Sequence, residues 1–259
     1  MIRVVAYNMS GGLDPNAVSA VLAAVTPDIV CAVEVPPRFG LRRIARRVGL
    51  EVAASAGRRR LNVAILTAEH VRVVSSVSHQ LSPVPGIVPR SVAQAIVGVR
   101  ALRLAAFAVQ LGLRPDVRER HCHDLEEYLR KVSAPVVVGA DLNEGPNGAV
   151  AQRLSALLQD AHGVSGQGLG DTYPNPEPLS RKDYVFVDRS LTLVRAWVPD
   201  EPPVAVASQH RPVVAEFAEP QEDRTRRRPS RAAIARRSAG PGSESAASPA
   251  PGAPVEPAA

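Results

Sequence analysis

Short apolar runs separated by polar, Gly- or Pro-containing breaks fill most of the first 217 residues, and their spacing alternates between the periods of strands and helices. Apolar runs typical of strands lie at 1–8, 28–34, 61–67, 71–77, 91–99, 102–111, 136–141, 181–188, 191–198 and 211–217. Helical spacing is found at 15–25, 37–49, 116–132 and 150–158. Several strands follow one another without an intervening helix, so the pattern predicts a mixed sheet region and not a regular βαβ alternation.

The segment VVVGADLNEGPN, residues 136–147, is the most informative run of the chain. Its three consecutive β-branched residues suit a strand covered on both faces, and Gly145-Pro146 stops the strand. Asp141 and Asn143 therefore stand at the end of a buried strand. Polar side chains in this position either serve a function or shape a turn, and this segment alone leaves both interpretations open.

Other strands of the predicted sheet region also carry polar side chains at their ends. The residues in question are Asn8, Glu34, Gln110, Asp141 and Asp183, with Gln209 and His210 directly before the last strand. A carboxylate at the end of an apolar strand is energetically unfavourable unless it is paired, hydrogen-bonded or bound to a metal. These strand ends predict one shared polar pocket, in which Asp183 is the natural partner of His210.

Length and composition favour one domain over residues 1–219, because 259 residues with 45% hydrophobic content are enough for one sizeable core. The two cysteines, Cys31 and Cys122, lie far apart in apolar surroundings, which favours buried thiols in a reducing compartment. No run of about 18 apolar residues occurs, and no leader-like segment precedes the first strand. We therefore expect a cytoplasmic protein without a membrane span, and a monomer.

The net charge of +6 is unevenly distributed. Seven arginines and four acidic residues follow Pro220, so half of the net charge lies in the last 39 residues and the preceding body is close to balanced. Residues 220–259 are rich in Arg and then in Ser, Ala, Pro and Gly, and we expect them to be disordered. Their Arg cluster is interpreted as part of a solubilising tail, with contact to nucleic acid as the alternative.

Residues 37–49 predict an amphipathic helix with Leu41, Ile44 and Val48 on its apolar face. The opposite face is basic and carries Arg42, Arg43, Arg46 and Arg47. Such a face is usually only solvated, and a direct contact with phosphate is the alternative.

The order of these segments, from residue 3 to about residue 217, resembles the endonuclease/exonuclease/phosphatase superfamily, the DNase-I-like metal-dependent phosphoesterases. The family patterns N-x-x-x-G, Q-E, G-D-x-N, R-I-D-Y and S-D-H-x-P-V are matched by YNMSGG, Val33-Glu34, GADLN (139–143), RKDY (181–184) and SQHRPV (208–213). Arg90 resembles a basic residue that many members place before a central strand. The resemblance implies an α+β fold, a four-layer α/β/β/α sandwich with the site at one edge of the packed sheets.

The resemblance also implies a divalent metal, held by Glu34 with help from Asn8 and with Gln209 in its neighbourhood. Mg²⁺ is the expected ion, with Mn²⁺ as the alternative, because Mg²⁺ takes hard oxygen ligands and bridges to substrate phosphate.

The remaining site residues would act on water and on the phosphoryl group. By resemblance, Asp141 orients or deprotonates the attacking water, and Asn143 fixes the pocket or the phosphate. His210, held by Asp183, stabilises the phosphoryl group, and Arg90 binds the substrate. The implied substrate is a phosphoester, and nucleic acid belongs to this class.

Two departures from the family pattern concern ionisable residues. Gln110 stands where the family has the His of T-H-L, and Gln209 stands where it has the Asp of S-D-H. An amide keeps hydrogen bonds but neither charge nor a transferable proton. We therefore expect a Mg²⁺-dependent hydrolase of reduced activity. The alternatives are a catalytically impaired phosphate-binding or interaction module and a DNA-processing nuclease, which the balanced charge and the 3% aromatic content disfavour.

Overall fold

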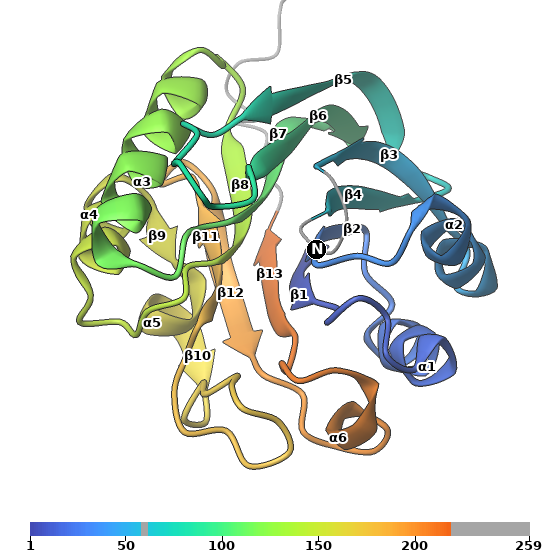
Figure 1. Ribbon diagram of the computed structural model, residues 1–259. Helices are drawn as coiled ribbons and strands as arrows, with labels where there is room; N and C mark the ends of the chain where they lie inside the picture. The colour runs from blue at the N-terminus through green and yellow to red at the C-terminus, as the bar shows by residue number, and fades with distance from the viewer. Residues whose placement is uncertain (58–61, 219–259) are drawn as a thin grey trace, which may run out of the picture. The chain divides into compact units, whose positions relative to one another are not determined.

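Two β-sheets packed face to face, each covered on its outer side by helices, make up the part of the chain that the computed structural model describes, residues 1–57 and 62–218 (Figure 1). This arrangement confirms the expected four-layer α/β/β/α sandwich. The predicted disordered tail, residues 220–259, lies outside the described residues, as does residue 219.

The first sheet has seven strands in the order β10-β12-β13-β1-β2-β4-β3. Their bounds are β1 Ile2–Asn8, β2 Ile29–Val33, β3 Leu50–Ala56, β4 Val63–Ala68, β10 Gly166–Gln167, β12 Thr192–Trp197 and β13 Val213–Ala218. The central strands β1 and β2 are parallel, and β13 joins β1 in antiparallel fashion. Consequently the ends of β1 and β2 lie side by side, with Asn8 opposite Val33.

The second sheet has six strands in the order β5-β6-β7-β8-β11-β9. Their bounds are β5 Arg72–Gln80, β6 Ser91–Val99, β7 Leu102–Gln110, β8 Val136–Asp141, β9 Gln159–Asp160 and β11 Asp183–Val187. Strands β7 and β8 are parallel, whereas β8 and β11 are antiparallel. Asp141 therefore lies between Gln110 on one neighbouring strand and Asp183 on the other.

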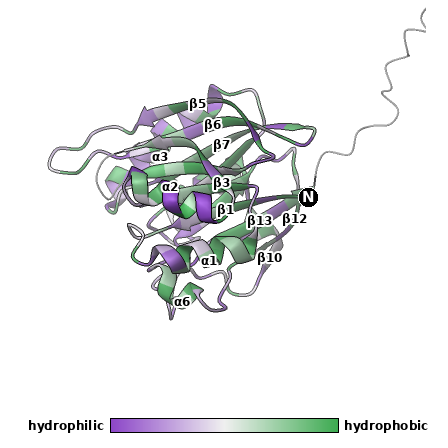
Figure 2. Cartoon of the chain, turned by 90° about the vertical axis from the view of Figure 1, so that its right-hand side faces the viewer, coloured by the Kyte–Doolittle hydropathy of each residue, from purple (hydrophilic) through white to green (hydrophobic). Residues whose placement is uncertain are grey.

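Helices cover both outer faces. On the first sheet, α1 (Pro15–Val25), α2 (Arg38–Arg47) and α6 (Val204–Ala207) bury their apolar sides, and on the second sheet α3 (Pro115–Arg130) and α4 (Ala149–Leu157) do so. A short α5 (Ala161–Ser165) packs near β11 and β12. The start of α1 matches its sequence signal, because the Asp14 carboxylate accepts hydrogen bonds from two backbone N–H groups of the first turn. Figure 2 shows the strands as largely hydrophobic and α2 as hydrophilic on its outer side.

Strand β3 is an edge strand that the apolar pattern did not predict. Its sequence, LEVAASA, is rich in small residues and has little of the β-branched alternation that marks a strand. It forms because β4 offers a free edge with which the backbone of β3 pairs over its full length. Tertiary context thus overrides a weak local preference.

The core between the sheets is built from small side chains where the two sheets approach most closely. At Gly139 of β8 an added Cβ would lie 2.3 Å from the Cβ of Cys31 and 3.2 Å from the Cβ of Ala6. Because side chains alternate along a strand, a residue two positions from an inward-facing residue also faces inward. The polar residues Asn8, Gln110, Asp141 and Asp183 stand two positions from the inter-sheet residues Ala6, Ala108, Gly139 and Val185. The strands therefore direct these polar side chains into the space between the sheets.

We expect Gly139→Ala to lower the free energy of unfolding by about 1–3 kcal/mol, because the new methyl group overpacks the contact with Cys31. Urea unfolding checks this. The matched control is Gly145→Ala, where an added Cβ meets nothing within 4 Å, and its stability is expected to change by less than about 0.5 kcal/mol. Equal stability of the two variants would contradict the proposed close contact.

Candidate active site

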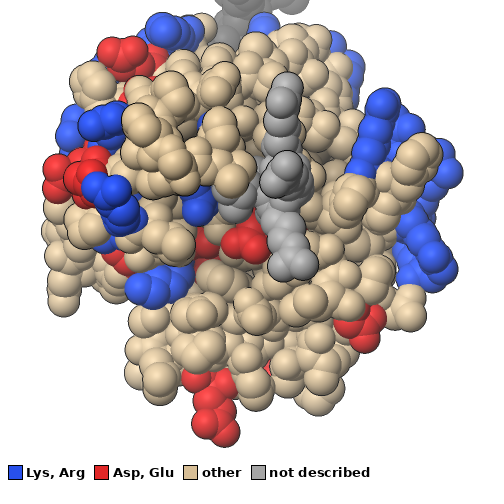
Figure 3. Space-filling view, in the orientation of Figure 1, with Lys and Arg blue, Asp and Glu red and all other residues tan. Residues whose placement is uncertain are grey.

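Polar side chains from six strand ends or adjoining loops meet at one end of the sandwich. Asn8 ends β1, Gln110 ends β7, Asp141 ends β8 and Asp183 begins β11, while Glu34 follows β2 and His210 precedes β13. Figure 3 looks onto this end of the molecule and shows acidic side chains in a recess near the centre of the face. The structure thus brings together residues that lie up to 202 positions apart in the sequence.

Two amide groups bridge two carboxylates across the gap between the sheets. The Asn8 Nδ2 donates to Glu34 Oε1 at 3.1 Å and to Asp141 Oδ2 at 2.9 Å. The Gln110 Nε2 donates to the same two oxygens, at 2.5 and 3.0 Å. Asn8 Oδ1 accepts a hydrogen bond from the Ser10 backbone N–H, which fixes the orientation of this amide. The two carboxylates are therefore held close together without a direct positive partner.

His210 and Asp183 form a buried pair beside these carboxylates. The His210 Nδ1 lies 2.7 Å from Asp183 Oδ2, and because a carboxylate only accepts, Nδ1 carries the proton. This leaves Nε2 facing the cluster, 3.4 Å from Asn8 Nδ2. The ring of Tyr173 packs against the imidazole with its centroid 4.7 Å away. The Asp183 pair and Tyr173 thus fix the imidazole so that one nitrogen points at the cluster.

Two residues that the sequence pattern missed hold this pair in place. Thr172 Oγ1 accepts a hydrogen bond from the Asp183 backbone N–H at 3.2 Å. Ser208 Oγ accepts from the His210 backbone N–H at 3.2 Å and donates to the Asn8 carbonyl oxygen at 2.6 Å. Short polar residues in loops carry no periodic signal. The only signal for Ser208 was its place in the SQH segment.

Burial and charge shift the pKa values of the cluster in a consistent direction. Burial raises the pKa of the Asp141 carboxyl, and the negative charge of Asp183 raises it further, while His210, Gln110 and Asn8 oppose the shift. For His210 burial lowers the pKa, but the charge of Asp183 and the hydrogen bond with it raise the pKa to about 9. The pair therefore has a protonated imidazole at neutral pH, and Asp141 is poised to take up a proton more readily than an exposed carboxylate.

Asp141 both shapes a turn and faces the site, so the two interpretations are compatible for this residue, whereas the contacts of the Asn143 side chain are those of the turn. Asp141 Oδ1 accepts a hydrogen bond from the Asn143 backbone N–H at 3.0 Å, whereas Oδ2 faces the cluster. Asn143 has a left-handed φ of 57°, and its Nδ2 donates to the Leu111 carbonyl oxygen at 2.9 Å. Glu34 is also left-handed, at φ 47°. Such conformations in non-glycine residues often occur at functional sites.

Arg90 supplies an unpaired positive group near the cluster. It directly precedes β6, its side chain is only 8% exposed, and its Nε and Nη1 atoms have no hydrogen-bond partner among the described residues. Burial lowers the pKa of the guanidinium, and the charges of Asp141 and Glu34 raise it. A buried guanidinium without partners is unfavourable unless a ligand completes it. Its placement is consistent with the predicted substrate contact.

The side chain of Gln209 does not join the cluster. Gln209 is exposed, and its contacts within the described residues come from its backbone: the N–H donates to Ser10 Oγ at 3.2 Å and the carbonyl oxygen accepts from the Asn175 N–H at 2.8 Å. The structure therefore places one of the two glutamines, Gln110, inside the site and the other at its surface.

The donor set of this cluster fits a divalent cation. The potential ligand atoms of Asp141, Asp183 and His210 lie within 4.8 Å of one another. Because the protonated imidazole of His210 donates hydrogen bonds and cannot coordinate a cation, this group offers the carboxylates of Asp141 and Asp183 as ligands. The buried Gln110 Oε1 has no partner among the described residues, and it adds an unused oxygen. Asn8 presents its N–H group to the carboxylates, so its predicted role as an oxygen ligand stays a prediction. Carboxylate and amide oxygens are the ligands that Mg²⁺ prefers.

The two packed sheets and their helices form a DNase-I-like fold of the phosphoesterase and nuclease type. The family model for the Endonuclease/Exonuclease/phosphatase family matches residues 5–232, and the chain belongs to this family. No curated protein matches significantly. No helix among the described residues is long and apolar enough to cross a membrane.

Solved structures with the same fold include enzymes of different kinds. The mannosyl-6-phosphatase Bt3783 of Bacteroides thetaiotaomicron is 15% identical with a TM-score of 0.76, and the match covers 85% of this chain and 100% of that one. The human Nocturnin catalytic domain with bound sulfate is 16% identical with a TM-score of 0.66, covering 84% and 93%. A protein of the family from Beutenbergia cavernae is 22% identical with a TM-score of 0.67, covering 83% and 71%. At these identities the likeness shows the fold alone.

The contact with Asp183 predicts a raised pKa for His210, which can be measured. In metal-free protein we expect the imidazole to titrate near pH 9, and in Asp183→Asn to titrate at a lower pH, because the carboxylate that raises its pKa most is then absent. The raised pKa stabilises the fold fully below about pH 6.5, and this contribution is lost as pH rises through about 9. Two-dimensional NMR of the imidazole nitrogens, with urea unfolding across this range, checks both expectations. Titration of His210 at pH 6.5 or lower in the native chain would contradict them.

Proposed function

We propose that this chain is a divalent-metal-dependent hydrolase of a phosphoester, a phosphodiester or a phosphomonoester. The observation that carries the proposal is the convergence of Glu34, Asp141 and the Asp183–His210 pair on one recess, with the unpaired Arg90 nearby. A recess that combines acidic ligands with two cationic donors is suited to a metal and to the anionic group that the metal binds.

Each residue has a role that its contacts support. Glu34, with carboxylates beside it, would hold a Mg²⁺ ion, which would neutralise charge at the phosphoryl oxygens. Asp141 Oδ2 accepts the proton of the attacking water, and its raised pKa favours that step. His210 donates a hydrogen bond from Nε2 to the phosphoryl group, while Asp183 keeps Nδ1 protonated. Arg90 donates from its unpaired nitrogens to the same phosphate.

With Gln110 in this position, we expect phosphoester hydrolysis to be slower than in a site that has an ionisable group there. Its Nε2 is engaged by both Glu34 and Asp141, so it neutralises no charge and transfers no proton. The absence of general acid–base assistance typically lowers a rate by about 10²- to 10⁴-fold. The same feature favours the second candidate function, a phosphate-binding module without turnover.

The substrate class is set by the loops around the recess, not by the residues that bind the phosphoryl group. Among the similar structures, one is a mannosyl-6-phosphatase and one holds a sulfate anion. Both names are consistent with a site for a tetrahedral anion. A sugar phosphate, a nucleic acid and a lipid headgroup phosphate are the three classes to test.

Mg²⁺-dependent hydrolysis of p-nitrophenyl phosphate and bis(p-nitrophenyl) phosphate tests the proposal. We expect Asp141→Asn to lower kcat/KM by about 10²- to 10⁴-fold, because the water loses its proton acceptor. Glu34→Gln is expected to weaken Mg²⁺ dependence. The matched control, Glu201→Gln, changes an exposed carboxylate away from the cluster and is expected to leave the rate unchanged. Phosphate binding by calorimetry without turnover in the native chain would instead support the binding module.

The two glutamines are expected to differ in what they limit. Gln110→His adds a proton-transferring group inside the cluster and is expected to raise kcat by tenfold or more. For Gln209→Asp, the family pattern predicts tighter Mg²⁺ binding, whereas the exposed position of Gln209 predicts no change. Mg²⁺ titrations of the rate in both single variants decide between these expectations. If Gln110→His left kcat at the native value, the proton-transfer argument would be wrong.

A further inference from the structure

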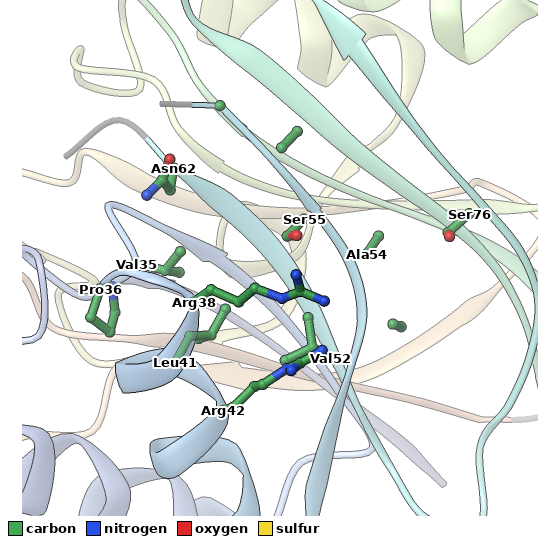
Figure 4. A pocket seen from close by; sticks show the side chains of 13 residues that line it. Val35, Pro36, Arg38, Leu41, Arg42, Val52, Ala54, Ser55, Asn62 and Ser76 are labelled. Atoms are coloured by element: carbon green, nitrogen blue, oxygen red, sulfur yellow. The ribbon is translucent and has the colours of Figure 1, made fainter. Parts of the chain in front are cut away.

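A cavity of about 580 Å³ lies between α2 and the edge strand β3 (Figure 4). Val35 and Pro36, which directly follow Glu34 in the chain, form part of its wall. The Val35 backbone N–H donates to the Asn62 carbonyl oxygen at 3.1 Å, which holds this wall to the segment before β4. The wall of the cavity is therefore continuous in the chain with Glu34 of the proposed phosphoryl site.

The cavity is lined by two arginines whose charges are not neutralised. Arg38 and Arg42 are exposed, and neither forms a hydrogen bond or ion pair with another described residue. Figure 4 shows both side chains extending from α2 across the cavity toward β3. Ser55, Asn62 and Ser76 add hydroxyl and amide groups, and no acidic residue is among the described residues that line the cavity. Figure 3 shows basic side chains gathered on the same side of the face.

The position of Arg38 on α2 is unfavourable for the helix itself. Arg38 is the first residue of α2, the first turn contains no acidic residue, and no side chain caps the helix. A positive charge near a helix N-terminus opposes the helix dipole, whereas Arg46 and Arg47 in the last turn complement it. The solvated-face interpretation therefore explains the C-terminal arginines of α2, and it gives no reason for Arg38 to stand at the N-terminus beside the cavity.

We infer that this cavity binds a second phosphate group of the substrate, so that the preferred substrate carries at least two phosphates. Arginine forks match phosphate oxygens, and the uncapped N-terminal N–H groups of α2 add partial positive charge at the same place. The inference rests on the proposed function, because the first phosphate occupies the Glu34–Asp141–His210 recess. It adds the substrate class, which the recess alone does not select.

The first test measures binding without catalysis. Inorganic pyrophosphate is titrated by calorimetry into metal-free protein in the presence of EDTA, where the carboxylates of the recess repel an anion and the cavity does not. We expect Arg38→Gln/Arg42→Gln to weaken binding by about tenfold or more, the loss expected for two charge-assisted contacts. The control is Arg43→Gln/Arg46→Gln, which removes the same charge from α2 outside the cavity, and it should bind within about twofold of the native chain.

The second test uses paired substrates in Mg²⁺. One pair is a sugar bisphosphate and the matched sugar monophosphate, and the other is a dinucleotide with and without a terminal phosphate. In the pair whose chemistry matches the natural substrate, we expect kcat/KM to be higher for the member with the additional phosphate. The double variant Arg38→Gln/Arg42→Gln should reduce that preference by about tenfold. The rate on the member with one phosphate and the melting temperature should stay at native values, since the double change removes only unneutralised charge.

The outcomes separate the two proposals. Pyrophosphate binding that both double variants weaken equally would show a general effect of charge and overturn the cavity site, as would equal rates on both members of each pair. If no substrate is hydrolysed, the proposed enzymatic function fails, and the calorimetric comparison still decides whether the cavity binds the anion. The salt dependence of the native binding should also decrease in Arg38→Gln/Arg42→Gln.

Discussion

The short distance between the two sheets is the constraint on which the site depends. Gly139 has no side chain because the Cβ of Cys31 occupies that space, and Ala6 is small for the same reason. With the sheets this close, side chains two positions further along the strands meet across the gap. Asn8 from one sheet then reaches Asp141 from the other at 2.9 Å, a contact that larger residues in the seam would prevent.

The cluster at the end of this seam is unfavourable for stability and favourable for chemistry. Buried carboxylates lose hydration, and two amides provide hydrogen bonds but no charge. The only cationic partner in direct contact, within the described residues, is His210, and the Arg90 nitrogens remain unsatisfied. A bound cation would offset the charge of the carboxylates, and a bound anion would satisfy the Arg90 nitrogens. This physical argument supports a metal and a phosphoryl group in the same recess.

The two glutamines show why a departure from a family pattern needs a structure to be interpreted. Gln110 lies at the centre of the cluster and holds Glu34 and Asp141 together. Gln209 is next to His210 in the sequence, yet it is exposed and its side chain does not join the cluster. An amide in place of an ionisable group therefore has different consequences at the two positions.

The buried strands, most helices and the polar residues at the strand ends could be predicted from local patterns, because periodicity and breaks are local properties of the chain. The order of the motifs also predicted the Asp183–His210 pair and the layered fold. The cavity beside Arg38 and Arg42 and the pairing of β3 with β4 became apparent only in the folded chain. Those features arise from contacts between segments that are distant or weakly patterned, and local sequence carries no signal for the space that such segments enclose.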